Sequence, residues 1–232
     1  MEFSGKKVTV VGTGISGIGA VGLLNAVGAE VVLYDGNEKL KIEDIEKKLG
    51  TYKAEIVLGE LTKELTDSSD LLVISPGVPI DSPVVKAFEA AGVPVWGEVE
   101  LAYAFDKGKV LAITGTNGKT TTTALVGQIV GAYHKDTFVV GNIGNPYTTE
   151  VLKSNKDSYT VAEISSFQLE TIHTFKPDVS AVLNITPDHL NRHHTMECYT
   201  NVKMSITKNQ DSNQPVILNY EDEILREYAP KL

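Results

Sequence analysis

The run Ile113-Thr114-Gly115-Thr116-Asn117-Gly118-Lys119-Thr120-Thr121-Thr122-Thr123 joins a predicted buried strand, residues 109–113, to a predicted helix over residues 124–130. A strand, a glycine-rich turn ending in Gly-Lys-Thr and a helix form the pattern of a phosphate-binding P-loop. In such a loop the lysine, here Lys119, binds phosphate oxygens together with backbone N–H groups, and the hydroxyl after it, here Thr120, binds Mg²⁺. The general pattern has a glycine where this chain has Ile113, so the alternative is a strand–turn–helix junction that binds nothing.

The four threonines at positions 120–123 favour the interpretation that the turn binds a ligand. Threonine is a poor helix former, by about 0.5 kcal/mol relative to alanine, so the run costs about 2 kcal/mol at the start of the helix. A helix start selected for folding alone would not need this cost. Hydroxyl groups directed at a metal ion and at phosphate oxygens explain the run better.

Composition limits the class of protein. A chain of 232 residues with 42% hydrophobic content can form one large domain or two smaller ones. The net charge of −9 argues against a general surface for nucleic acid or anionic membrane, which needs excess Lys and Arg. The single cysteine, Cys198, permits no disulfide within the chain and indicates a reducing compartment. Because the sequence shows neither a signal-peptide pattern nor a stretch of transmembrane length, we expect a cytoplasmic protein.

A second glycine-rich turn lies near the N-terminus. A predicted strand, residues 6–11, leads into Gly12-Thr13-Gly14-Ile15-Ser16-Gly17, and a predicted helix continues to Gly28. The next predicted strand, residues 30–34, is followed by Asp35, at the spacing of the dinucleotide-binding fingerprint. This unit predicts a Rossmann-like nucleotide site, for which NAD or FAD is the default ligand. The alternative is that the glycines only permit close packing of the strand and the helix.

The remaining elements alternate between strands and helices, which predicts parallel-sheet α/β domains. Ser75-Pro76-Gly77 follows the apolar strand 71–75, at the carboxyl end where open α/β sheets bind ligands. The polar break at residues 106–108 predicts a boundary between a domain of residues 1–105 and a domain of residues 106–232. Further predicted helices cover residues 42–49, with a solvated charged face, 84–91, 97–103 and 199–209, and further predicted strands, with the turns that follow them, cover residues 56–59, 93–96, 138–144, 159–169, 179–185 and 215–219.

The second domain has a charged residue within one predicted strand and a cluster of polar residues after another. Glu163 lies in an otherwise apolar strand, where a carboxylate is costly unless it is paired or bound to metal, and a frayed strand end is the alternative. Residues 188–194 contain three histidines, an aspartate and an arginine directly after another buried strand. This density predicts a site near phosphates or a metal, although no second ligand cluster supports structural zinc. Lys203, in the predicted helix 199–209, would be interpreted as a solvated lysine when taken alone.

These motifs together resemble the Mur ligase family. The loop from Gly115 to Thr121 is similar to the P-loop variant of the Mur ligases and the folylpolyglutamate synthetases, which lacks the first glycine. The motifs occur in the order of the family, and the resemblance covers essentially the whole chain. The more selective motifs are Ile164-Ser165-Ser166-Phe167-Gln168-Leu169-Glu170, Asp188-His189-Leu190-Asn191-Arg192-His193, and the turns at residues 12–17 and 75–77.

The resemblance implies an ATP-dependent ligase that forms a C–N bond in peptidoglycan synthesis, from the branch that joins D-glutamate to UDP-N-acetylmuramoyl-L-alanine. ATP would phosphorylate the carboxylate of the UDP-linked substrate, and the amine of D-glutamate would displace phosphate from the acyl phosphate. The implied fold is an N-terminal Rossmann-like parallel-sheet domain followed by a P-loop NTPase-like central α/β domain. The implied ligands are the two substrates, ATP and Mg²⁺, bound by a monomer that contacts neither nucleic acid nor membrane.

Site residues are also implied by the resemblance. Lys119 would hold the ATP phosphates with the other residues of the loop, Gly115, Thr116, Asn117, Gly118, Thr120 and Thr121. Thr120 would bind Mg²⁺, Glu163 would bind a second Mg²⁺, and His189 would lie beside that metal and the substrate. Catalysis would then depend on positioning and on neutralising the charge of the transferred phosphoryl group.

Lys203 matches the lysine that the family carbamylates. Free lysine titrates at about pH 10, so its amine must be made neutral before CO₂ can add. The product is an anion, which would help to position the metal ion.

The first domain of the family binds UDP, so the resemblance replaces NAD as the expected ligand. Asn142, in Gly141-Asn142-Ile143-Gly144, matches a contact with substrate and nucleotide. The residues that match the uridine and diphosphate contacts are Gly14, Ile15, Ser16, Asp35, Asn37, Ser75, Pro76 and Gly77.

Two departures from the family pattern affect these expectations. Asn191 replaces the usual aspartate of the Asp-His-Leu-Asp-Arg-His motif, which removes a charge near the site. The family has a third, C-terminal domain that binds D-glutamate, whereas this sequence ends at Leu232, so we expect an incomplete central domain and no ligation by the 232-residue chain. The alternatives are another amide ligase of the Mur and folylpolyglutamate synthetase family, a non-catalytic module that binds a UDP-sugar or nucleotide, and a dehydrogenase.

Overall fold

The computed structural model describes residues 2–232, which fold into two compact units. Two short segments from the second half of the chain belong to the first unit, so neither unit is one continuous stretch. The first unit holds the chain up to Phe105 with Pro146–Leu152 and Thr171–His173, and the second holds Asp106–Asn145, Lys153–Glu170 and Thr174–Leu232.

The first unit contains a sheet of five parallel strands in the order β3-β2-β1-β4-β5. The chain winds outward from β1 to β3 and then crosses to β4 and β5, so the direction of winding reverses between β1 and β4. This doubly wound arrangement confirms the predicted Rossmann-like fold. The strands are β1 (Lys7–Val11), β2 (Glu30–Asp35), β3 (Glu55–Leu58), β4 (Leu71–Ile74) and β5 (Val95–Gly97).

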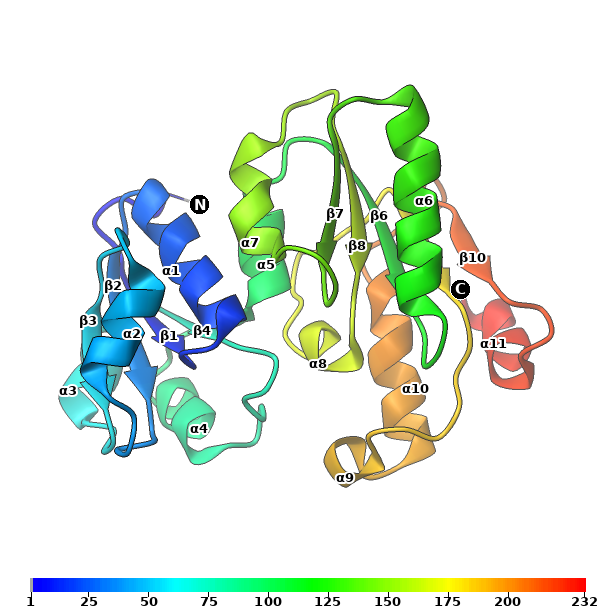
Figure 1. Cartoon of the computed structure of the whole chain (residues 1–232). Helices are drawn as coiled ribbons and strands as arrows, with labels where there is room; N and C mark the ends of the chain where they lie inside the picture. Colours follow the sequence, from blue (N-terminus) through cyan, green and yellow to red (C-terminus); the bar gives the residue numbers. More distant parts are fainter. Residues whose placement is uncertain (1) are drawn as a thin grey trace. The chain divides into compact units, whose positions relative to one another are not determined.

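Helices bury both faces of this sheet. Val10 and Val11 are neighbours on β1 and point to opposite faces, yet both are buried. One face carries α1, which packs on β1 and β2 (Figure 1). Val11 belongs to a separate apolar core with Leu65 of α3 and Phe88 of α4. The helices of this unit are α1 (Ile15–Ala26), α2 (Ile42–Leu49), α3 (Lys63–Ser68), α4 (Pro83–Ala90), α5 (Glu98–Tyr103) and α7 (Tyr147–Glu150).

The second unit also contains five parallel strands, in the order β10-β9-β6-β8-β7. Its first strand in the chain, β6, lies at the centre of the sheet, and α6 packs on β6, β7 and β8 (Figure 1). This arrangement confirms the predicted P-loop NTPase-like α/β fold. The strands are β6 (Lys109–Thr114), β7 (Thr137–Gly141), β8 (Tyr159–Glu163), β9 (Val179–Val182) and β10 (Val216–Leu218).

Two predicted helix starts in this unit are wrong. The helix predicted from residue 124 begins at Lys119, directly after the glycine turn. The helix predicted over residues 199–209 begins at Met196, because the Thr195 side chain caps it by accepting a hydrogen bond from the N–H of Cys198. Within residues 2–232, none of the helices combines the length and the apolar character needed to cross a membrane. The helices are α6 (Lys119–Tyr133), α8 (Ser166–Leu169), α9 (Leu190–His193), α10 (Met196–Met204) and α11 (Glu223–Tyr228), with 3-10 turns at Val151–Lys153, Ser205–Thr207 and Ala229–Lys231.

The strand order of the second unit decides which loops meet. At the end of β6, Ile113 pairs with Glu163 of β8 and Thr114 pairs with Val182 of β9. The loops that follow these three parallel strands therefore lie at the same edge of the sheet. This edge brings the P-loop next to Glu163 and next to the segment that follows β9.

Candidate functional site

The P-loop turn depends on two glycines with positive φ. Gly115 has a φ of 147° and Gly118 has a φ of 81°, values that residues with a Cβ rarely adopt. A Cβ on Gly115 would also lie 3.0 Å from the Cβ of Leu183 and 3.2 Å from its backbone nitrogen. The turn is therefore specified both by its backbone conformation and by its close contact with the segment after β9.

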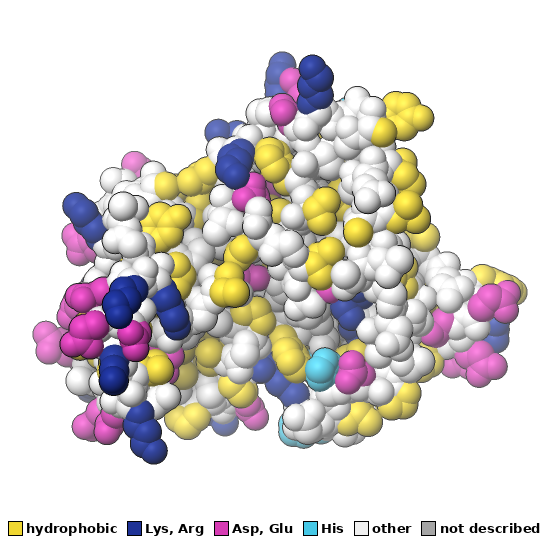
Figure 2. All heavy atoms as spheres, in the orientation of Figure 1, with side chains coloured by type: hydrophobic (Ala, Val, Ile, Leu, Met, Phe, Trp, Pro, Cys, Tyr) yellow, Lys and Arg dark blue, Asp and Glu magenta, His cyan; other side chains and the backbone are white. Residues whose placement is uncertain are grey.

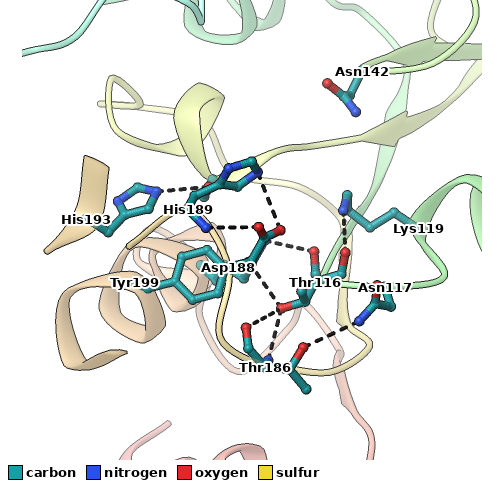
Figure 3. Close-up of polar contacts among 12 residues, drawn as sticks. Thr116, Asn117, Lys119, Asn142, Thr186, Asp188, His189, His193 and Tyr199 are labelled. Carbon is teal, nitrogen blue, oxygen red and sulfur yellow. Dashed lines mark hydrogen bonds and ion pairs between the residues drawn. The ribbon is translucent and has the colours of Figure 1, made fainter. Parts of the chain in front are cut away.

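Two residues of that segment, Asn184 and Thr186, hold the P-loop, and Figure 3 shows Thr186 beside Thr116 and Asn117. The Asn184 side chain accepts a hydrogen bond from the Asn117 N–H at 2.8 Å and donates one to the Asn117 carbonyl at 2.9 Å. The Thr116 hydroxyl donates to the carbonyl of Thr186 at 3.2 Å and accepts from the N–H of Thr186 at 3.0 Å. Neither Asn184 nor Thr186 was predicted as a site residue. The available signal was their position directly after a buried strand.

The start of α6 offers donors for an anion. The first hydrogen bond within the helix runs from the Thr122 N–H to the Gly118 carbonyl at 3.0 Å, so the N–H groups of residues 118–121 have no acceptor inside the helix. Such groups, with the positive end of the helix dipole, favour bound phosphate. Lys119 lies among them, and its Nζ donates to the carbonyl of Thr116 at 2.9 Å.

The threonine run at the start of α6 divides into exposed and buried members. Thr120 and Thr121 are exposed and can meet a ligand. Thr123 is fully buried, and its hydroxyl has no hydrogen-bond partner among residues 2–232. The prediction that these hydroxyls face metal and phosphate is therefore wrong for Thr123, because the face of α6 that carries it packs inside the unit.

Glu163 is a buried carboxylate at the end of β8, with 1% of its surface exposed, which excludes a frayed strand end. Its Oε1 accepts a hydrogen bond from the Asn142 side chain at 2.8 Å, and the Asn142 N–H donates to the Glu163 carbonyl at 2.9 Å. Its other oxygen, Oε2, is buried and has no hydrogen-bond partner in the described part of the chain. A buried carboxylate oxygen without a donor is costly, and a hard cation such as Mg²⁺ would satisfy it.

Residues 2–232 contain no group of three or more His, Cys, Asp or Glu side chains that could hold a metal ion by themselves. The predicted metal ligands include only two residues of these types, Glu163 and His189, together with Thr120 and Lys203. A metal ion bound by this set would therefore need further oxygen ligands from a bound phosphate or from water.

Lys203 is buried on α10, with only 2% of its surface exposed, so it is not a solvated lysine. Its Nζ donates to the carbonyl of Gly115 at 2.8 Å and lies 4.9 Å from the centre of the Tyr199 ring. Burial, and then the charge of Lys119, lower the pKa of Lys203 to about 7, whereas Asp188 acts in the opposite direction. A substantial fraction of this amine is therefore neutral at physiological pH.

The chain turns sharply after β9 at His189, which has a φ of 51°. The ring of His189 packs against Phe167, with the ring centres 4.7 Å apart, and its Nε2 lies 3.4 Å from Asp188 Oδ2. Both side chains of this pair are nearly half exposed. Asp188 and His189 are therefore accessible to a ligand at the edge of the sheet that carries the P-loop.

Arg192 and His193 make structural contacts within the cluster at residues 188–194, of which only His189 was predicted as a site residue. Arg192 forms a partly buried ion pair with Glu170 through its Nη2 and Nε atoms. The Nε2 of buried His193 lies 3.0 Å from the hydroxyl of Ser166. Burial, followed by the charge of Arg192, lowers the pKa of His193. These contacts join α9 to α8 and fix the segment that carries His189.

In the first unit, the turn from Gly12 to Gly17 is tightly packed. A Cβ on Gly17 would lie 1.9 Å from the carbonyl oxygen of Gly12, and one on Gly12, which has a φ of 103°, would lie 2.8 Å from Ser75 Oγ. The Ser75 hydroxyl is buried and finds no hydrogen-bond partner within residues 2–232. The predicted residues Gly14 and Ile15 are exposed at the start of α1. This site lies at the reversal between β1 and β4, where doubly wound sheets bind ligands.

Asp35 joins the glycine turn to the loop after β2. Its carboxylate accepts hydrogen bonds from the Thr13 hydroxyl and from the Asn37 N–H, both at 3.1 Å. The predicted residues Pro76 and Gly77 follow Ser75 at the end of the neighbouring strand β4. The structure therefore places the predicted residues of this unit at the ends of three adjacent strands.

Lys48 is a further residue of this region that was not predicted. It lies on α2, whose charged side chains are on the surface as expected (Figure 2). Its Nζ nevertheless reaches the glycine turn and donates to the carbonyl of Thr13 at 3.3 Å. The neighbouring Lys47 instead pairs with Asp44 of the same helix.

A Rossmann-like unit and a P-loop unit in one chain define a class of two-domain α/β proteins. In this class a glycine-rich turn follows the first strand of each sheet. Residues 113–232 match the family model described as Mur ligase middle domain, and residues 6–97 match the model described as Mur ligase MurD-like, N-terminal domain. The chain belongs to the Mur ligase family. The match of the N-terminal unit disfavours the alternative of a folylpolyglutamate synthetase.

Curated relatives match the whole chain but extend well beyond it. The chain is 66% identical over 231 residues to the UDP-N-acetylmuramoylalanine–D-glutamate ligase of Lachnospira eligens, a match that covers 100% of this chain and 51% of that protein. It is 59% identical over 233 residues to the protein of the same name from Lachnoclostridium phytofermentans, again with 100% and 51% coverage. The chain therefore spans about half the length of the curated relatives that it matches.

Solved structures support the fold. The UDP-N-acetylmuramate:L-alanyl-gamma-D-glutamyl-meso-diaminopimelate ligase from Neisseria meningitides superposes with a TM-score of 0.65 at 17% identity, over 99% of this chain and 76% of that chain. A murein peptide ligase from Psychrobacter arcticus superposes with a TM-score of 0.59 at 18% identity, over 98% and 52% of the two chains. At these identities the likeness concerns the fold alone.

Proposed function

We propose that this chain supplies the UDP-substrate and ATP sites of an ATP-dependent ligase that joins D-glutamate to UDP-N-acetylmuramoyl-L-alanine. The observation that carries the proposal is Glu163 Oε2, a buried carboxylate oxygen on the strand beside the P-loop that receives no hydrogen bond from residues 2–232. Its environment favours a bound cation next to the free N–H groups that favour phosphate. The names of the relatives at 66% and 59% identity supply the reaction.

The reaction would take place in two steps. An oxygen of the substrate carboxylate attacks the γ-phosphorus of ATP, and the bond from that phosphorus to the β–γ bridging oxygen breaks to release ADP. The amine of D-glutamate then attacks the acyl carbon, phosphate leaves, and the amine loses a proton. Lys119 and the N–H groups of residues 118–121 would neutralise the charge of the transferred phosphoryl group, which is where electrostatic stabilisation is largest.

The residues at the edge of the second sheet fit Mg²⁺. Glu163 and the exposed hydroxyl of Thr120 are hard oxygen donors, and His189 is an accessible nitrogen donor. A bound Mg²⁺ supplies a positive charge that polarises phosphoryl oxygens. Asn142 would orient Glu163 through the hydrogen bond at 2.8 Å, so that the second carboxylate oxygen stays directed at the cation.

Lys203 is proposed to carry a carbamate. Its neutral amine would attack CO₂, a C–N bond would form, and one proton would leave, which yields an anionic side chain. A pKa of about 7 makes the neutral amine available without an additional base. The carbamate would then be a further oxygen ligand at the P-loop, as the family resemblance implies.

The glycine turn of the first unit is proposed to bind the UDP part of the substrate. Gly14, Ile15 and Ser16 present backbone N–H groups at the start of α1, where a diphosphate is favoured. Asp35 is the last residue of β2 and Asn37 lies in the loop that follows, whereas Ser75, Pro76 and Gly77 follow β4. A NADH titration against UDP-N-acetylmuramoyl-L-alanine separates this proposal from a dehydrogenase.

The ligase is proposed to act as a cytoplasmic monomer without nucleic acid or membrane. The net charge of −9 disfavours polyanionic partners, and the single cysteine is exposed and unpaired, as expected in a reducing compartment. Sedimentation velocity in the presence and absence of the substrates would test the monomer.

The test is release of ADP by the protein as its gene encodes it. We expect release to require both UDP-N-acetylmuramoyl-L-alanine and D-glutamate, and to fall at least about 100-fold in Glu163→Gln, because the buried oxygen loses its charge. The matched control is Glu197→Gln, the same change at an exposed position of α10. ADP release that does not depend on D-glutamate, or that is unchanged in Glu163→Gln, would contradict the proposal.

A further inference from the structure

Two residues of helix α10 contact the P-loop at its consecutive residues Gly115 and Thr116. Tyr199 and Lys203 lie about one helical turn apart on α10. Lys203 Nζ donates to the carbonyl of Gly115 at 2.8 Å, and the Tyr199 hydroxyl lies 3.1 Å from Thr116 Oγ1. Tyr199 is fully buried, so its hydroxyl has been removed from water in favour of this contact. Figure 3 shows the Tyr199 ring directed toward the loop that contains Thr116.

The other hydrogen bonds of Thr116 leave an acceptor position for the Tyr199 hydroxyl. A threonine hydroxyl has one proton and two acceptor positions. The proton of Thr116 is directed to the Thr186 carbonyl at 3.2 Å, and one acceptor position is taken by the Thr186 N–H at 3.0 Å. The second acceptor position is then filled by the Tyr199 hydroxyl.

We propose that Tyr199 is a positioning residue that holds the P-loop in its phosphate-binding conformation through Thr116. Thr116 lies two residues before the N–H groups of residues 118–121, so a rotation of its backbone would redirect all of them. The role rests on the proposed function only in that these groups bind the phosphates of ATP. Lys203 bonds to the carbonyl of Gly115 through Nζ, the nitrogen that is proposed to be carbamylated. The hydrogen bond between Tyr199 and Thr116 does not involve this nitrogen and is independent of carbamylation.

The experiment combines hydrogen exchange with ATP titration for three proteins: the unaltered chain, Tyr199→Phe and Tyr133→Phe. Tyr199→Phe removes only the hydroxyl and leaves the ring beside Lys203. Tyr133→Phe is the matched control, because Tyr133 lies on α6 of the same unit and is 84% exposed. Loss of one hydrogen bond predicts exchange about five-fold faster at the amides of residues 115–121, and about five-fold weaker binding of ATP with Mg²⁺. Tyr133→Phe should change neither quantity.

Two further measurements separate positioning from general instability. UDP affinity and the exchange of amides in β1 should stay unchanged in Tyr199→Phe, because both belong to the first unit. Thr116→Val removes the acceptor, and the double variant with Tyr199→Phe should exchange no faster than Thr116→Val alone. If Tyr199→Phe yields too little folded protein, Thr116→Val removes the partner of Tyr199 together with both bonds to Thr186, and unchanged exchange at residues 115–121 in that variant would overturn the role.

The outcomes distinguish the two proposals. Exchange at residues 115–121 that is the same in Tyr199→Phe and in the unaltered chain would overturn the positioning role, whatever the nucleotide result. Additive effects of Tyr199→Phe and Thr116→Val would also overturn it. If the unaltered chain does not bind ATP, the proposed function is contradicted. Faster exchange at residues 115–121 in Tyr199→Phe would then still support the positioning role.

Discussion

The two glycine-rich turns of this protein have glycines at positive φ in common but are held in place by different contacts. Each follows the first strand of a five-stranded parallel sheet and opens a helix, and each contains glycine at positive φ. The turn at Gly12–Gly17 is packed most closely against itself, since a Cβ on Gly17 would collide with the carbonyl of Gly12. Asp35 and Lys48 bond only to Thr13 of this turn. The turn at Gly115–Gly118 is held by side chains from elsewhere, such as Asn184 and Lys203.

The two turns also differ in the charged groups that could neutralise a bound phosphate. Near the first turn the predicted contacts are uncharged apart from Asp35, so backbone N–H groups would carry most of the binding of a diphosphate. Near the second turn Lys119 and the buried Lys203 lie close enough for the charge of one to lower the pKa of the other. A similar backbone is therefore suited to binding in one unit and to chemistry in the other.

The largest expected effect comes from removing the charge of the second turn. Lys119→Met should lower ADP release by the gene-encoded protein at least about 100-fold, because the proposed contact of Lys119 with the phosphoryl oxygens would be lost. UDP affinity, measured by calorimetry, should stay unchanged, since that site lies in the first unit. Lys135→Met, at an exposed position after α6, is the matched control. Equal losses of ADP release and UDP affinity would show that the two turns are not independent.

The next effect concerns the local packing of the first turn. Gly17→Ala should lower the free energy of unfolding of the first unit by about 2–3 kcal/mol, because the new Cβ would lie 1.9 Å from the Gly12 carbonyl oxygen. Gly14→Ala is the control for stability, since nothing lies within 4 Å of a Cβ there. Urea unfolding measures both variants. Equal stabilities would mean that the first turn tolerates side chains and is not specified by packing.

A smaller effect is the pH dependence that Lys203 produces. Its pKa of about 7 in the folded chain lies below the ordinary value of 10.5, so between these values the unfolded chain binds more protons than the folded chain. The free energy of unfolding should therefore rise with pH in this window, by up to about 1.4 kcal/mol per pH unit, and the contribution should flatten below pH 7.

Urea titrations between pH 7 and 9 in CO₂-depleted buffer measure this slope. Lys203→Met should remove it, whereas Lys135→Met should retain it. A slope that persists in Lys203→Met would assign the titration to another group, and the charge of the second turn would then need a different explanation.

The smallest effect tests whether the first turn has any cationic contact. Lys48→Ala should weaken UDP binding about three-fold without changing uridine binding, because Lys48 Nζ already reaches the Thr13 carbonyl at the turn. Lys47→Ala removes the same charge from the adjacent position, which pairs with Asp44, and should have no effect. Equal losses for UDP and uridine would leave the turn without a phosphate-specific cation.

Local signals predicted most of the fold. Alternating apolar strands and helices, with glycine turns after the first strand of each sheet, were sufficient for two parallel α/β units, because strand burial and turn geometry depend on neighbouring residues. Helix starts were less predictable, since the side chain of Thr195 extends α10 beyond its apolar pattern. The return of Pro146–Leu152 and Thr171–His173 to the first unit had no local signal.

The candidate site was predictable only in part. Glu163 was identified because a carboxylate in an apolar strand violates a local rule. Tyr199 and Asn184 follow ordinary patterns of a helix and a strand end, so they were missed, and no local signal showed that His193 contacts Ser166. Lys203 was identified by resemblance, because its environment depends on Gly115, 88 positions earlier in the chain.

By itself, the amino-acid sequence determined the two sheets, their glycine turns and the residue types available to bind phosphate and metal, because these follow from periodicity and local backbone conformation. Tertiary packing determined the surroundings of those residues. It buries Lys203 within the range of the charge of Lys119 and places Thr116 beside Tyr199, 83 positions away. It also leaves one oxygen of Glu163 without a hydrogen-bond donor in the described part of the chain. The physical reason is that protonation and hydrogen bonding depend on distance and exposure to water, and neither quantity exists until distant segments are packed together.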